Sequence, residues 1–176
     1  MLSDIALRVV PVLGRLDVTA DDSAGPGPGT IVVANHSSLI DPGVVLAALA
    51  RGQVVVVYPE GRLPLRRDSA DRTPESFRSG VARLALATGA PVVPLGQAGA
   101  RRITSGGRFE QLAGLFTAPL RRPRLHVHLG APVRLSGTLA EATAQAHTAL
   151  TAAWVIAATL AGSNGCAPDR GDRGRR

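Results

Sequence analysis

The chain contains no lysine, a single cysteine, few aromatic residues and no long hydrophobic run. Its basic residues are therefore all arginine, which suggests a bias in genomic base composition more than a function. Because Cys166 is alone, an intrachain disulfide is excluded and a reducing compartment is indicated. Hydrophobic residues make up 45% of the chain and aromatics only 3%, so valine, leucine and alanine must form the core. The length of 176 residues suits one domain.

No segment has the pattern of a membrane span or a secretory signal. The longest apolar stretch, Ala149–Ala161, is too short to cross a bilayer. Met1–Val12 lacks the basic-then-apolar layout of a signal peptide. Any membrane contact is therefore expected to be peripheral. The localisation that we expect is cytoplasmic, at the inner face of the cell membrane.

The chain is basic, with a formal net charge of +7, and four of its arginines lie in Arg170–Arg176. Such a balance favours acidic partners such as anionic lipid headgroups, coenzyme A, acyl carrier protein or nucleic acid. The arginines are not interleaved with aromatic residues and match no recognised nucleic-acid motif. We therefore expect no nucleic-acid partner.

The most informative stretch is Thr30–Asp41. Its β-branched run Thr30–Ala34 predicts a short buried strand, and His36 follows just past the strand end. Asp41 and Pro42 predict the N-cap and first turn of a helix. A short loop lets the Asp41 carboxylate meet the imidazole, which would fix its tautomer and make the other ring nitrogen a base. Asp41 is thus expected both to cap the helix and to orient His36.

A helix over Pro42–Ala50 and a second buried strand over Val54–Tyr58 complete a predicted βαβ unit. Strands joined in this way are parallel, and their carboxyl ends share one edge of the sheet. We therefore expect His36 and Glu60-Gly61-Arg62 to emerge side by side.

The remaining pattern predicts an α/β fold with a mostly parallel central sheet flanked by helices. One domain is expected over residues 1–160, and a disordered, arginine-rich tail over residues 161–176. Gly96–Arg124 is expected to be irregular, and Pro64–Ser76 to form a charged flap. The other expected helices are Ser3–Leu13, Phe77–Thr88 (with Gly89 as C-cap) and one or two helices over Leu139–Leu160. The other expected strands are Leu16–Thr19, Val92–Leu95 and Leu125–Leu129.

Several side chains are expected to have structural roles only. His126 and His128 alternate with apolar residues on one face of a strand, and we expect them at the surface; a metal site would need further ligands that the sequence does not supply. His147 is also expected to be exposed.

The first helix, with Ile5, Val9 and Val12 on one side, is expected either to dock on the domain or to lie at a membrane surface. Leu150, Trp154 and Ile156 are expected to be buried.

Three sequence boxes, in order, resemble those of the PlsC-like glycerolipid acyltransferases, the lysophosphatidate acyltransferase family. Asn35–Asp41 resembles the N-H-x4-D box, Val57–Arg62 resembles the F-P-E-G-T-R block, and Ala90–Leu95 resembles the late V-P-V-x-P-V block. Phe77–Ala85 is similar to the family's F-x-x-G-x-x-x-L-A helix. The resemblance covers roughly Thr30 to Leu95.

The resemblance implies acyl transfer from an acyl-CoA or acyl-carrier-protein thioester to a lysophospholipid hydroxyl, with 1-acylglycerol-3-phosphate as the default acceptor. In this picture His36 is the base, Asp41 its orienter, and Glu60, Gly61 and Arg62 the acceptor-binding loop. No cofactor, metal or prosthetic group is needed, and no serine nucleophile is implied, because the G-x-S-x-G pattern of hydrolases is lacking.

The sequence departs from the family pattern between the first two boxes, where the family has several dozen more residues and a box with a phosphate-binding arginine. Here only Pro42–Pro59 intervene, and Arg62 replaces the usual threonine. We expect Arg62, Arg66 or Arg67 to substitute as phosphate ligands. The alternative is a catalytically weak or inactive paralogue that binds lipid or acyl carrier protein.

Overall fold

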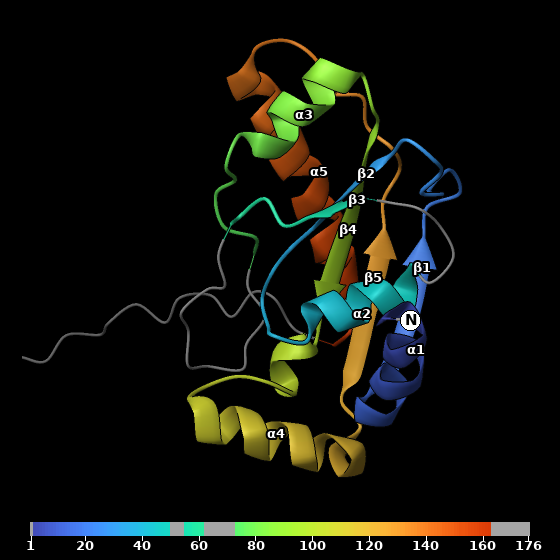
Figure 1. Cartoon of the computed structure of the whole chain (residues 1–176), viewed down its shortest axis with the longest axis vertical. Helices are drawn as coiled ribbons and strands as arrows, with labels where there is room; N and C mark the ends of the chain where they lie inside the picture. The colour runs from blue at the N-terminus through green and yellow to red at the C-terminus, as the bar shows by residue number, and fades with distance from the viewer. Residues whose placement is uncertain (1, 50–54, 62–72, 163–176) are drawn as a thin grey trace, which may run out of the picture.

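The computed structural model describes residues 2–49, 55–61 and 73–162, which form a five-stranded sheet covered by helices on both faces (Figure 1). The strand order is β1-β5-β4-β2-β3, and β2, β3 and β4 run parallel to one another. β1 and β5 are parallel to each other, and β5 joins β4 in antiparallel fashion. The predicted α/β fold with a mostly parallel sheet is therefore confirmed. The strands are β1 (Arg15–Ala20), β2 (Ile31–Ala34), β3 (Val55–Val57), β4 (Val92–Ala98) and β5 (Arg124–Leu129).

The helices form a layer on each side of the sheet. Alternate residues of β2 separate the two cores: Val32 and Ala34 pack toward α1, α2 and α4, whereas Ile31 and Val33 pack toward α3 and α5. This burial on both faces explains why β2 and the first part of β4, Val92–Leu95, are continuous apolar runs. The helices are α1 (Leu2–Leu13), α2 (Asp41–Ala48), α3 (Gly80–Thr88), α4 (Arg108–Arg121) and α5 (Leu139–Leu160).

Helix α5 has the bounds that the sequence predicted. It begins at a capping box, in which the Glu141 carboxylate accepts the Thr138 backbone N–H at 2.7 Å. Leu150 and Trp154 are buried as expected, but Ile156 is exposed, so that part of the prediction was wrong. Gly96 of β4 lets the two elements approach closely, because a Cβ atom there would lie 2.2 Å from the Ala153 backbone.

The segment Gly96–Arg124 was expected to be irregular, and this was wrong. β4 continues to Ala98, a 3-10 turn (η1, Ala100–Arg102) follows, and then α4 begins at Arg108. Helix α3 also begins later than predicted, at Gly80, but it ends as expected. Gly89 has φ 67° and donates its N–H to the Ala85 carbonyl at 2.8 Å, which confirms the C-cap.

Helix α1 docks on the domain by a different side from the one predicted. Ala6 and Val10 are buried, whereas Ile5, Val9 and Val12 are exposed. None of the helices in the part of the chain described here is long and apolar enough to cross a bilayer. The tail from residue 163 onward, and most of the predicted flap over 64–76, lie outside the described residues.

The prediction that His126 and His128 lie at the surface was also wrong, since both are buried in β5. Their rings share the hydroxyl of Thr19 on β1, at 3.0 Å from His126 Nε2 and 2.9 Å from His128 Nδ1. Burial lowers the pKa of His126 below its ordinary value of 6.5. No group of three or more histidine, cysteine or acidic side chains suited to a metal ion occurs within residues 2–49, 55–61 and 73–162.

Candidate active site

His36 and Asp41 form a hydrogen-bonded pair at the carboxyl end of β2. His36 Nδ1 lies 3.2 Å from Asp41 Oδ2. The aspartate is completely buried, whereas the histidine side chain keeps 17% of its surface exposed. An ionised carboxylate can only accept, so the proton of the neutral imidazole resides on Nδ1. The other nitrogen, Nε2, is then left with a lone pair.

Asp41 holds the loop that carries His36, but it does not cap helix α2 as predicted. The N-cap position is Ile40, and no side chain caps the helix. Instead Asp41 Oδ2 accepts the backbone N–H of Ser37 and, at 2.6 Å, that of Ser38. The carboxylate therefore reaches back into the loop, and a single oxygen serves both the backbone and the imidazole.

Tyr58 and Glu60 follow the neighbouring strand β3 and reach the same site. The Tyr58 ring lies against the His36 ring, with centroids 4.6 Å apart and planes tilted by 33°. Burial and the nearby Asp41 charge raise the pKa of Tyr58, so its hydroxyl stays protonated. The predicted juxtaposition of His36 with the acidic turn is thus present.

Glu60 is buried beside the histidine loop and accepts a hydrogen bond from the His36 backbone N–H. Burial, together with the smaller effect of the Glu75 charge, raises the pKa of Glu60 from 4.5 to about 7 against the opposing effect of that hydrogen bond. A carboxyl group that titrates near neutrality can donate or accept a hydrogen bond, as binding of a substrate hydroxyl requires.

Gly61 gives the acidic turn its shape. It has φ 69°, and a Cβ atom there would lie 2.9 Å from Arg78 Nε. Arg78 in turn donates its backbone N–H to the Pro59 carbonyl at 2.8 Å. Only glycine adopts this conformation without strain. The predicted phosphate ligands Arg62, Arg66 and Arg67 lie outside the described residues.

The loop is also anchored by residues about 60 positions further along the chain, which sequence reasoning missed. Asn35 Oδ1 accepts the Gln97 backbone N–H at 2.8 Å, and Asn35 Nδ2 donates to the Gln97 carbonyl at 3.0 Å. Arg101, itself buried, donates from Nη1 to the Ser37 carbonyl at 2.8 Å. Ser38 Oγ forms a hydrogen bond with Thr104 Oγ1.

A signal for part of this set was available. β2 and β4 are adjacent parallel strands, so polar residues just beyond their apolar runs meet at one edge. Gln97 follows the run Val92–Leu95 by two residues, as Asn35 follows Ala34 directly. No comparable signal marks Arg101 or Thr104, because the turn η1 that presents them was not predicted.

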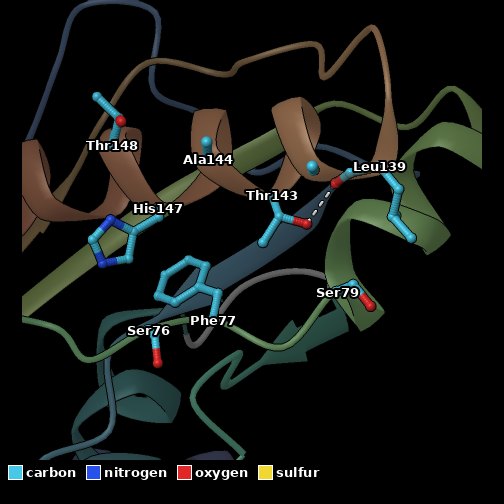
Figure 2. A pocket seen from close by; sticks show the side chains of 9 residues that line it. Ser76, Phe77, Ser79, Leu139, Thr143, Ala144, His147 and Thr148 are labelled. Carbon is cyan, nitrogen blue, oxygen red and sulfur yellow. Dashed lines mark hydrogen bonds between the residues drawn. The ribbon is translucent and has the colours of Figure 1, made fainter.

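A mostly apolar cavity of about 750 Å³ lies between the segment that leads into α3 and helix α5 (Figure 2). The Phe77 and His147 rings meet edge to face on its wall, 4.9 Å apart. His147 is therefore half-buried, not exposed as predicted. The segment that lines the cavity also carries Glu75, whose charge acts on Glu60 of the acidic turn.

No family model matches this chain, and no curated protein matches it. Among solved structures, the chain is similar to the crystal structure of the 1-acyl-sn-glycerophosphate (LPA) acyltransferase PlsC from Thermotoga maritima. The match covers 90% of this chain and 78% of that chain, with a TM-score of 0.65 and 17% sequence identity. A likeness at this identity speaks for the fold alone. The chain therefore has a PlsC-like fold, as the resemblance of its three sequence boxes implied.

Proposed function

We propose that this protein is an O-acyltransferase that moves a fatty acyl group from a thioester to the hydroxyl of a lysophospholipid. The observation that carries the proposal is the His36–Asp41 pair, which lies beside Glu60 at the shared edge of two parallel strands. The PlsC-like fold supports it, because a protein of that fold is an LPA acyltransferase.

In the proposed reaction the acceptor hydroxyl gives its proton to His36 Nε2 while its oxygen bonds to the thioester carbonyl carbon. The Asp41 carboxylate keeps the Nδ1 proton in place and stabilises the imidazolium that forms. The carbon–sulfur bond then breaks, and the imidazolium returns the proton to the departing thiolate. No covalent enzyme intermediate, metal or prosthetic group enters this scheme.

The substrates follow from the chemistry around the pair. We propose an acyl-CoA or acyl carrier protein as donor and 1-acylglycerol-3-phosphate as acceptor, with Glu60 binding a substrate hydroxyl. The apolar cavity beside Phe77 has room for an acyl chain. Arg62, Arg66 and Arg67 are proposed to hold the acceptor phosphate by charge-assisted hydrogen bonds.

A thioester-release assay with lysophosphatidate as acceptor tests the catalytic role of His36. We expect His36→Ala to lower turnover by about 100-fold or more, since a positioned base contributes at least this much. Ser37→Ala, a matched change in the same loop, should retain activity because no serine nucleophile is involved. Absence of wild-type turnover, with retained binding of lipid or carrier, would favour the non-catalytic alternative.

The phosphate ligands need a separate test. Replacement of Arg62, Arg66 and Arg67 together by alanine should raise the KM for lysophosphatidate strongly, because the guanidinium groups proposed to bind its phosphate are lost. The KM for a monoacylglycerol, which has no phosphate, should change little. An unchanged KM for the phosphorylated acceptor would contradict the assignment.

A further inference from the structure

Helix α4 turns its large apolar side chains toward solvent. Phe109 is 89% exposed, Phe116 79% and Leu120 88%, and Leu112 is half exposed on the same side. These four residues recur at spacings of three and four, so they form one continuous stripe. Two of the three phenylalanines in the chain lie in it. We call this stripe the α4 apolar face.

The opposite side of α4 is firmly seated on the rest of the domain. Ala118 is completely buried in the core beneath α1 and α2. At Gly114 the helix approaches η1 so closely that a Cβ atom would lie 2.1 Å from the Ile103 carbonyl oxygen. The helix therefore cannot roll to bury its phenylalanines, and its exposed stripe is a fixed feature of the surface.

Positive charge flanks the α4 apolar face at the carboxyl end of the helix. Arg122 and Arg124 are exposed there, and Arg124 is the direct partner of the exposed Arg15 on β1. The acidic residue of α4, Glu110, is at the other end, where it accepts the Gly107 backbone N–H at 2.5 Å. Neighbouring arginines of this kind repel one another unless an anion lies between them.

We propose that the α4 apolar face docks on an anionic lipid bilayer. Phenylalanine and leucine side chains enter the boundary between headgroups and acyl chains, and the arginines at the helix end bind lipid phosphates. The segment before α4 is bonded to the histidine loop through Arg101 and Thr104. Docking therefore places His36 near the bilayer, which is the source of a lysophospholipid. This last consequence rests on the proposed function, whereas the docking itself does not.

Sedimentation of the full-length protein with vesicles tests the docking. We expect the wild type to bind phosphatidylglycerol vesicles and not phosphatidylcholine vesicles. Phe109→Gln with Phe116→Gln should weaken binding by about tenfold or more, because both rings leave the interface. Val155→Gln with Leu160→Gln, which changes two exposed apolar residues of α5 on the other side of the sheet, should bind as the wild type does.

A separate variant tests how much the arginines at the helix end contribute to vesicle binding. Arg122→Gln with Arg124→Gln should weaken binding by about fivefold per arginine and reduce its salt dependence. His36→Ala should bind vesicles fully, so loss of turnover with intact vesicle binding would reject only the proposed function. Unchanged binding of the double phenylalanine variant, or no binding by the wild type, would overturn the docking. So would a dimer in sedimentation velocity that the same variant abolishes, since a second copy would then cover the face.

Discussion

At the scale of single residues, Glu60 is a buried carboxyl group whose charged form the fold disfavours. Because burial raises its pKa from 4.5 to about 7, the folded protein retains a proton here that the unfolded chain releases. The contribution of Glu60 to the free energy of unfolding is therefore fully present below pH 4.5 and is lost as the pH rises through about 7. A group kept under such conditions is typical of a functional site.

Glu60→Gln tests this account, since glutamine mimics the protonated acid and cannot ionise. Near pH 5 we expect the variant and the wild type to be about equally stable. At pH 8 the variant should be more stable by about 2–3 kcal/mol. Urea unfolding at the two pH values measures the difference. A variant that is less stable at pH 8 would show that the ionised carboxylate is the favoured form.

Arg101 is expected to act on catalysis by holding the histidine loop in place. Arg101→Met removes the hydrogen bond to the Ser37 carbonyl, so His36 loses part of its fixed orientation. We expect kcat to fall by about tenfold or more, as small displacements of a base are costly. Arg102→Met is the matched control, because Arg102 binds the Ala161 carbonyl instead. Equal kcat values for the two variants would contradict the role.

The sequence was sufficient to predict that His36, Asp41 and Glu60 lie together, because local boxes mark them. It was insufficient to predict the residues that support their loop. Gln97 and Arg101 lie more than 60 residues from the loop that they hold. Their positions depend on the course of the chain after β4, which no local pattern specifies. The orientation of His36 by Asp41 was predicted, but the helix-cap role was wrong, since an aspartate before proline suits a cap equally well.

At the scale of elements, the contact between β4 and α5 depends on Gly96. Gly96→Ala would place a methyl group against the Ala153 backbone, which cannot move without displacing the helix. We expect a loss of about 3 kcal/mol in the free energy of unfolding, or failure to fold. Gly80→Ala, where no atom lies within 4 Å, should be neutral or slightly stabilising. Thermal unfolding of both variants makes the comparison.

Elements were predictable where the apolar pattern reflects burial. Both ends of helix α5 were predicted correctly, and Leu150 and Trp154 of its apolar pattern are buried in the structure. Helix α4 was missed because most of its large apolar side chains face solvent, and because Gly114 and Pro119 weaken the helical pattern. Strand β5 was predicted, but its alternation of histidine with apolar residues was taken to mean that one face is exposed. In the structure both histidines are buried, and one ring nitrogen of each forms a hydrogen bond with the Thr19 hydroxyl.

At the scale of the whole molecule, the order of strands was only partly predictable. The β2–α2–β3 unit follows from connection rules, so its parallel pairing could be expected. The pairing of β1 with β5 joins segments about 110 residues apart, and no local rule selects it. The polar interaction across this pair, between Thr19 and the two histidines, therefore appeared only in the structure.

Thr19 is expected to contribute to the stability of the β1–β5 pair through its hydroxyl. One hydroxyl has a single proton, so it donates to one imidazole and accepts from the other. Thr19→Val keeps the side-chain shape but leaves two buried ring nitrogens without this partner, which should cost about 1–3 kcal/mol. Urea unfolding at pH 8 measures the loss. The reciprocal change on the same strand, Val18→Thr at an exposed position, should alter stability by less than about 0.5 kcal/mol. If Thr19→Val were as stable as the wild type, this contact would add nothing to the joining of the first strand to the fifth.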